Sequence, residues 1–349
     1  MIVRWARRNP RWLAALVGIV VVLAVFGPQV PIWGRCTANL DQCSAQILEG
    51  VFRGMIIALI ALGYTLVYGI LQLINFANGD VFMLGSVITL LGVQIAGLTS
   101  GSDATAVILT FVVLLPVTML LTAGLNASIE KVAYRPLRRA PTLATLISAI
   151  GMSFILQNVG QKLIGPSPVS LPNILPTDVV IGPGGPIQLG SIEVKTSDLF
   201  VTIVTVPLLI GLLWFVQNTR QGKAMRATAQ DREASGLMGI DVNRTISLTF
   251  LLAGALAGGA GLVVALYNGS AWWFYGTPYG LLAFTAAVFG GIGNLAGAVV
   301  GGLTLGVLIQ INAFYFEQRW QDIFVFGILV LILVFRPTGL LAAKQTERA

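Results

Sequence analysis

Two polar stretches interrupt a sequence that is 56% hydrophobic and only 10% charged. The longer one runs from Thr219 to Arg244 and reads TRQGKAMRATAQDREASGLMGIDVNR. Residues from Lys223 to about Leu237 favour a helix that Gly236 and Gly239 can end. Such a helix has a polar face with a small apolar stripe beside it. The face holds Arg226, Gln230 and Glu233, and the stripe holds Ala234, Leu237 and Met238.

The chemistry open to this helix is non-covalent recognition. A short amphipathic helix can dock into a groove on a soluble partner. The alternative is a solvated basic linker held near anionic lipid, which accounts for the arginines but not for the apolar stripe. We therefore expect a docking segment.

The second polar stretch, YTLVYGILQLINFANGD, joins two apolar runs and carries Gln72, Asn75, Asn78 and Asp80. Polar residues at membrane depth are costly and usually face a cavity or a pathway. Interrupted helices often hold the substrate sites of transporters. We expect a broken helix at Asn75 and Asn78, whereas Asp80 fits equally well as a cap on the next helix at a cytoplasmic turn.

Several kinds of chemistry are excluded by residues that the sequence lacks. It contains no histidine, so imidazole catalysis and histidine-based metal sites are impossible. No G-x-x-x-x-G-K-[ST] phosphate loop occurs, because Gly222-Lys223 is followed by Ala224. We expect no catalytic residue, no metal and no cofactor bound by this chain. If ATP drives the protein, a partner must hydrolyse it.

The two cysteines, Cys36 and Cys43, lie in one short polar segment. A disulfide across so small a loop would contribute roughly 2–3 kcal/mol and requires an oxidising compartment. A disulfide is slightly favoured over two free thiols.

The polar stretches are positioned by apolar runs long enough to cross a ~30 Å hydrocarbon layer as helices. Helices are expected because lipid leaves backbone groups no partner outside the segment. The predicted fold is all-α, a polytopic transmembrane helical bundle of 8–10 spans with some short or broken helices. The expected spans are residues 12–30, an extra N-terminal span, followed by 51–72, 81–98, 104–125, 142–163, 198–217, 245–267, 278–292, 295–314 and 321–335.

The basic residues predict which ends face the cytoplasm. With ten spans and both termini inside, 16 of the 21 Lys and Arg residues fall on the inner side, as the positive-inside rule requires. This layout explains the net charge of +7 without nucleic acid. Residues 219–244 become a cytoplasmic loop, and the Pro- and Gly-rich residues 164–197 an external one.

Glycines one helical turn apart recur in the second half of the chain, as in Gly302 and Gly306. This spacing lets helix backbones approach closely in lipid. We expect tight packing within one subunit, with a subunit–subunit interface as the minority alternative.

Six strings over residues 50–340 carry a family resemblance. They are GYTLVYGILQLINFANGDVFMLG, EKVAYRPLR, LISAIGMSFILQN, GKAMRATAQDREASGLMGIDVNRTISLTF, AFTAAVFGGIGNLAGAVVGG and RPTGLL. They resemble the branched-chain amino acid ABC-importer permease family, in detail its H-type inner-membrane subunit. Glu233-Ala234-Ser235 followed by Gly239 is similar to the E-A-A-x-x-x-G pattern with which such permeases contact the ATPase.

The resemblance implies a membrane permease domain of an ABC importer in the bacterial inner membrane. Its partners would be a second homologous permease, two ATP-binding cassette subunits and an external solute-binding protein. Closure of the ATPase pair would move the docking helix and switch the spans by alternating access. The ATPase contacts would be Arg226, Asp231 and Glu233, with Gly239 letting the chain turn.

The family leads to branched-chain or related amino acids as substrates, with urea or short-chain amides as the alternative. A different class, a self-sufficient channel or ion-coupled carrier, would need several paired buried charges, and Asp80 is the only deep candidate. The expected substrate path is lined by Tyr64, Tyr68, Gln72, Asn75 and Asn78.

Overall fold

The computed structural model describes residues 40–72, 75–99, 102–138, 140–175, 188–189, 192–193, 195–316, 318–336 and 338–341. This part is 82% helical, with 11 helices. Eight of the described helices are long and apolar enough to cross a membrane. The predicted all-α transmembrane bundle is confirmed. The expected first span, residues 12–30, and Cys36 lie outside the described residues, so a bond from Cys36 to Cys43 stays a prediction.

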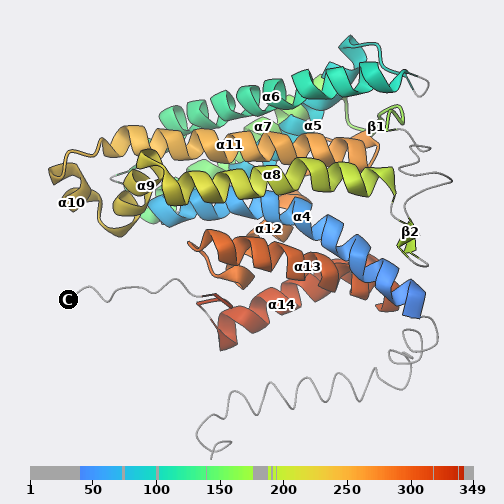
Figure 1. Cartoon of the computed structure of the whole chain (residues 1–349). Helices are drawn as coiled ribbons and strands as arrows, with labels where there is room; N and C mark the ends of the chain where they lie inside the picture. The colour runs from blue at the N-terminus through green and yellow to red at the C-terminus, as the bar shows by residue number, and fades with distance from the viewer. Residues whose placement is uncertain are drawn as a thin grey trace, which may run out of the picture.

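The elements keep the labels of Figure 1, in which all the long helices run between two ends of the molecule. In chain order they are α4 (Leu40–Leu71), α5 (Ala77–Ile95), α6 (Ala104–Ile129), the π-helical turn η1 (Glu130–Tyr134), α7 (Thr142–Ile164), β1 (Val169–Ser170), β2 (Gln188–Leu189), β3 (Ile192–Glu193), α8 (Thr196–Asn218), α9 (Arg220–Gln230), α10 (Arg232–Leu237), α11 (Val242–Tyr267), β4 (Ser270–Ala271), α12 (Gly276–Gly290), α13 (Leu295–Phe316), the 3₁₀ turn η2 (Gln318–Trp320) and α14 (Gln321–Phe335).

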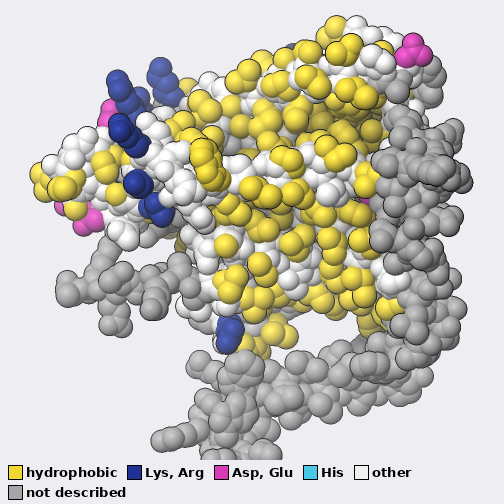
Figure 2. Space-filling model, viewed as in Figure 1, with side chains coloured by type: hydrophobic (Ala, Val, Ile, Leu, Met, Phe, Trp, Pro, Cys, Tyr) yellow, Lys and Arg dark blue, Asp and Glu magenta, His cyan; other side chains and the backbone are white. Residues whose placement is uncertain are grey.

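The helices form a buried centre and an apolar exterior. The apolar part of α4 is 83% buried, and α5 and α11 resemble it, whereas the apolar part of α14 is only 11% buried. Outward-facing side chains on the outer helices, such as Val112, Ile203 and Val330, are aliphatic. Figure 2 shows this hydrophobic band between the two ends of the molecule. A helix whose outer face is apolar suits contact with lipid.

Glycine allows α13 to pack directly on α4. A Cβ at Gly306 would lie 2.3 Å from the Cα of Gly54, and a Cβ at Gly302 would lie 2.5 Å from the Cα of Ala58. Such close backbone approach is what small residues one turn apart permit. The expectation of packing within one subunit is confirmed for this helix pair.

The predicted span limits agree with the helices to within a few residues in nearly every case. The exception is α4, which begins at Leu40 rather than near Val51, because the helix continues past its apolar run into a polar turn. The helices α12 and α14 have 15 residues each and are the short elements that the sequence suggests.

The two ends of the bundle differ in chemistry. The strand pairs β1–β4 and β2–β3 lie at the end opposite α9 and α10 (Figure 1). At that strand end, Trp272 and Trp273 both donate to the carbonyl of Pro166, at 3.2 and 2.8 Å. Lys and Arg side chains gather instead over the end that carries α9 and α10 (Figure 2).

Candidate functional site

The polar segment after α8 forms two short helices, so the prediction of one helix from Lys223 to Leu237 is wrong. The backbone at Asp231 is extended, with φ −152° and ψ 119°. Its Oδ1 accepts from the N–H groups of Glu233 and Ala234 at 2.8 and 3.0 Å. A carboxylate in this position satisfies the free N–H groups at a helix start. Asp231 therefore ends α9 and begins α10, and Glu233 does not share a face with Arg226.

Tight turns fix both ends of this segment. The hydroxyl of Thr219 accepts from the N–H of Gly222 at 3.0 Å and caps α9. At the other end, Gly239 has φ +82°, a conformation that glycine adopts without strain. This turn leads into α11, which Asp241 caps by accepting from the N–H of Arg244 at 3.1 Å.

The tip formed by α10 is apolar and exposed. Leu237 is 90% and Met238 83% exposed, and Ala234, Glu233 and Asp231 are exposed beside them. The tip extends beyond the bundle at its basic end (Figures 1 and 2). An apolar patch of this kind, bordered by charges, is typical of a protein-binding surface. Arg226, on α9, is also exposed and donates to the carbonyl of Gln217 at 3.1 Å.

One side chain attaches α10 to the membrane bundle. Nη2 of Arg232 donates to the carbonyl of Ile70, in the last turn of α4, at 2.9 Å. Burial lowers the pKa of Arg232, and the positive charge of Arg138 nearby lowers it further. No feature of the sequence distinguishes Arg232 from the other arginines of the segment.

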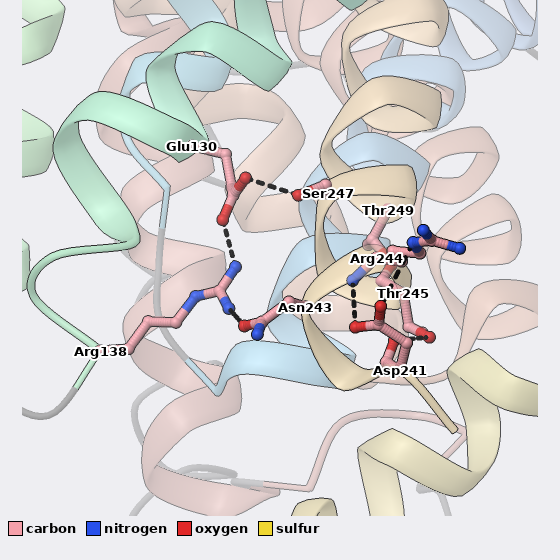
Figure 3. Close-up of polar contacts among 8 residues, drawn as sticks. All are labelled: Glu130, Arg138, Asp241, Asn243, Arg244, Thr245, Ser247 and Thr249. Atoms are coloured by element: carbon pink, nitrogen blue, oxygen red, sulfur yellow. Dashed lines mark hydrogen bonds and ion pairs between the residues drawn. The ribbon is translucent and has the colours of Figure 1, made fainter. Parts of the chain in front are cut away.

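A polar cluster around the buried carboxylate of Glu130 joins η1 to the beginning of α11 (Figure 3). The carboxylate of Glu130, only 1% exposed, accepts from Nη2 of Arg138 and from the hydroxyl of Ser247 at 2.8 Å. Nη1 of Arg138 donates to Oδ1 of Asn243 at 2.5 Å. Asn243 lies 105 positions after Arg138, and Ser247 lies 117 positions after Glu130, so these two contacts could not be foreseen. Glu130 and Arg138 are only 8 positions apart.

The helix interruption lies where the sequence predicts it. The helix α4 ends at Leu71 and α5 begins at Ala77, and Gln72 is exposed with φ +55°. The hydroxyl of Tyr134 donates to Oδ1 of buried Asn75 at 2.6 Å. Neither amide atom of fully buried Asn78 has a hydrogen-bond partner within the described protein.

Asp80 does not cap α5, so that alternative is wrong. It lies in the first turn of the helix, and its carboxylate accepts from the hydroxyl of Ser153 and from Nε2 of Gln157 at 3.1 Å. Gln157 also donates to Thr277 of α12 at 3.2 Å. The side chain therefore joins α5 to α7 and α12 at membrane depth instead of ending a turn.

A cleft opens between α4 and α12. It holds about 220 Å³ of empty space, including open solvent, which is below the ~300 Å³ at which small-molecule pockets begin. Its lining residues are Tyr64, Thr65, Tyr68, Phe284, Ala287 and Ile292. Of the expected path residues, Tyr64 and Tyr68 line this cleft, and Gln72, Asn75 and Asn78 do not.

This fold and this site define a polytopic α-helical membrane protein with an exposed apolar tip at its basic end. The chain belongs to the family described as branched-chain amino acid transport system / permease component, whose model matches residues 46–333.

Its relatives carry consistent names. The chain is 38% identical over 303 residues to the high-affinity branched-chain amino acid transport system permease protein BraD of Pseudomonas aeruginosa, covering 87% of this chain and 97% of that one. It is 38% identical to LivH of Escherichia coli, covering 87% and 96%, and 37% identical to LivH of Salmonella typhimurium, covering 87% and 96%. No solved structure matched the chain.

The protein is therefore a permease component of an ABC importer, a membrane protein that works with ATPase and solute-binding partners. The alternative of a self-sufficient channel or carrier is not supported, because the family is a component of a transport system.

Proposed function

We propose that this permease carries branched-chain amino acids into the cell by alternating access powered by a partner ATPase. The names of its BraD and LivH relatives, both branched-chain amino acid permeases, support this substrate class. The observation that carries the mechanism is the exposed apolar tip of α10, joined to α4 through Arg232. Urea or a short-chain amide remains the alternative substrate.

The proposed assembly contains a second homologous permease, two ATP-binding cassette subunits and an external solute-binding protein. The chain would lie in the bacterial inner membrane as one permease domain, with both termini in the cytoplasm. The gathering of basic side chains at the end with α9 and α10 (Figure 2) supports a cytoplasmic position for residues 219–244. The strands β1, β2 and β3, which belong to the expected external loop 164–197, lie at the other end, and this loop would then face the solute-binding protein.

In this proposal the ATPase pair binds α9 and α10 through Arg226, Asp231 and Glu233, while Gly239 permits the turn into α11. The exposed Leu237 and Met238 would fill an apolar groove on the ATPase. When the ATPase pair closes, α10 moves, and its bond from Arg232 to the carbonyl of Ile70 transfers that movement to α4. ATP is bound and hydrolysed by the partner, and this chain binds no cofactor.

The substrate would pass beside Tyr64 and Tyr68, because α4 moves with α10 and these residues line the cleft against α12. The cleft is below the usual size of a small-molecule pocket, so in this proposal α4 and α12 separate during transport. Gln72, Asn75 and Asn78 would join the path once the α4–α5 junction opens. Buried amide groups without partners, such as those of Asn78, would then meet water or substrate.

The substrate is tested by reconstituting the permease in liposomes with its ATPase and solute-binding partners and measuring uptake of labelled leucine and labelled urea. We expect ATP-dependent leucine uptake, competed by isoleucine and valine. Uptake of urea but not leucine would overturn the substrate class. Leucine uptake by this chain alone, without the ATPase, would overturn the mechanism.

A further inference from the structure

The carboxylate of Asp80 is buried at membrane depth and has no positively charged partner among the described residues. Its side chain is almost fully covered, with Asp80 only 2% exposed. None of the ion pairs formed by the described residues includes it. Acidic side chains inside a membrane are rare and usually mark the pathway of a substrate or an ion. The groups around Asp80 show which kind of ligand it suits.

Three oxygen atoms from three different helices converge on one nitrogen beside this carboxylate. Nε2 of Gln157 donates to Oδ1 of Asp80, on α5, at 3.1 Å. The hydroxyl oxygens of Ser153, on α7, and Thr277, on α12, lie 3.3 and 3.2 Å from the same nitrogen. A side-chain amide has only two N–H groups, whereas an ammonium group has three and a positive charge. The three oxygens therefore match an ammonium group better than the amide that lies between them.

The surroundings of Asp80 favour the ionised carboxylate. The hydroxyl of Ser153 donates to Oδ2, which leaves the lone pairs of the hydroxyl oxygen able to accept. Asp80 lies in the first turn of α5, where the helix dipole favours a negative charge. Close packing fixes its place, because a Cβ at Gly276 of α12 would lie 2.2 Å from Oδ1. The fold thus holds a negative charge at this point without supplying a cation.

The side chains that cover the carboxylate can move without a change in the helices. Ser153, Gln157 and Thr277 are each half-buried, whereas Asp80 is buried beneath them. A side chain changes its rotamer far faster than helices move relative to one another. Rotation of Gln157 therefore suffices to remove the amide nitrogen from the three oxygens when a charged group arrives.

The cleft between α4 and α12 lies close to this carboxylate. Tyr64 lines the cleft, and its hydroxyl would lie 3.2 Å from a Cβ at Gly79 and 2.9 Å from one at Gly280. Gly79 directly precedes Asp80. The rest of the cleft lining is largely apolar. A carboxylate and an apolar surface are therefore available near each other, on either side of Tyr64.

We propose that Asp80, Ser153 and Thr277 bind the α-ammonium group of the transported amino acid, in place of the amide nitrogen of Gln157. This inference rests on the proposed function. The ammonium group supplies the positive charge and the three donors that the oxygens match, and the aliphatic side chain lies toward the cleft at Tyr64. Urea and short-chain amides are neutral and gain no ion pair from Asp80. The site thus selects amino acids against them.

The test is binding of labelled leucine to the detergent-solubilised importer, without its solute-binding protein, against two competitors. Isoamylamine is leucine without its carboxylate, and isocaproate is leucine without its ammonium group. With the unmodified importer we expect the amine to displace leucine at a concentration about tenfold or more below that of the acid. In Asp80→Asn, which is similar in size and can still accept from Ser153, this preference should vanish. The preference is a ratio, so it does not depend on how much of the variant folds.

Two further variants separate ligand binding from a structural role. Gln157→Ala removes the amide and leaves the three oxygens, so the preference for the amine should persist. The matched control is Asp198→Asn. Asp198 is also a buried carboxylate in the first turn of a helix, α8, but it accepts from the backbone N–H of Lys195 at 3.3 Å and not from α7. Its preference should equal that of the unmodified importer.

Several results would overturn the inference. They are no preference for the amine in the unmodified importer, an unchanged preference in Asp80→Asn, and loss of the preference in Gln157→Ala or in Asp198→Asn. Leucine binding that requires sodium ions would assign the carboxylate to a metal ion instead. An importer that takes up leucine in liposomes but does not bind it without the solute-binding protein would also contradict the site. Absence of ATP-dependent leucine uptake by the complete unmodified importer would instead contradict the proposed function.

Discussion

At the residue scale, the neighbouring side chains of Asp231 and Arg232 at the start of α10 point in different directions and make different contacts. Asp231 is exposed and its carboxylate caps the helix, whereas Arg232 turns inward to the carbonyl of Ile70. The first shapes the surface offered to a partner, and the second attaches that surface to α4. Substitutions should therefore be able to break the attachment of α10 to α4 without affecting the docking of the ATPase on α10.

Replacing Arg232 should detach the exposed tip of α10 from α4. Arg232→Ala removes the donor to the Ile70 carbonyl and keeps the exposed tip, so ATPase binding should persist. Substrate uptake should fall by about tenfold, because a charge-assisted hydrogen bond of ~1.5–3 kcal/mol is lost. Co-purification of the ATPase and labelled-leucine uptake measure the two effects. Lys131→Ala, at an exposed position of η1 outside α9 and α10, is the control and should change neither. Normal uptake by Arg232→Ala would show that α4 is moved through other contacts.

The structures around Asp231 and Asp80 could not be predicted from the sequence. Asp231 followed by the acidic Glu233 in the first turn is a recognisable helix start. The residues on both sides favour helix, however, so the composition predicts one continuous helix. The partners of Asp80, Ser153 and Gln157, are 73 and 77 positions away. No local pattern reports such a contact, so the cap on α5 looked equally good.

At the element scale, lipid makes helix positions predictable. A span must be apolar over its whole length, so the limits of α6, α7, α8 and α13 could be read from the sequence. The order of burial could not be predicted, because α4 in the centre and α14 on the outside are similarly apolar. The turn η1 was equally hidden, since a π-helical turn has no composition of its own.

The packing of α13 on α4 gives a prediction for glycine. In Gly306→Ala the new methyl group would overlap the backbone of Gly54, and overpacking of this kind costs ~1–3 kcal/mol. The midpoint of thermal unfolding in detergent should therefore fall. Gly211→Ala is the matched control on α8, where a Cβ meets nothing within 4 Å, and its midpoint should stay the same or rise, because alanine favours a helix by up to ~1 kcal/mol. Equal midpoints for both variants would mean that α13 and α4 do not pack this closely.

At the scale of the whole molecule, the fold separates a basic end with an exposed apolar tip from an end with short strand pairs and tryptophans (Figures 1 and 2). The buried centre between them contains the buried part of the helix interruption, at Asn75 and Asn78, and the cleft. Composition and charge were sufficient to predict a membrane bundle and its basic end. The connection between tip and cleft required the structure, because it consists of side chains that meet only after folding.

The central claim, that the tip of α10 receives the ATPase, is tested most directly by co-purification. The importer is extracted in detergent with a tag on this permease, and the ATPase retained is measured. We predict stoichiometric ATPase with the unmodified chain and with Lys162→Glu, a charge reversal at an exposed site at the far end of α7, and loss of the ATPase with Glu233→Lys or Leu237→Asp. Full retention of the ATPase by both α10 variants would contradict the account.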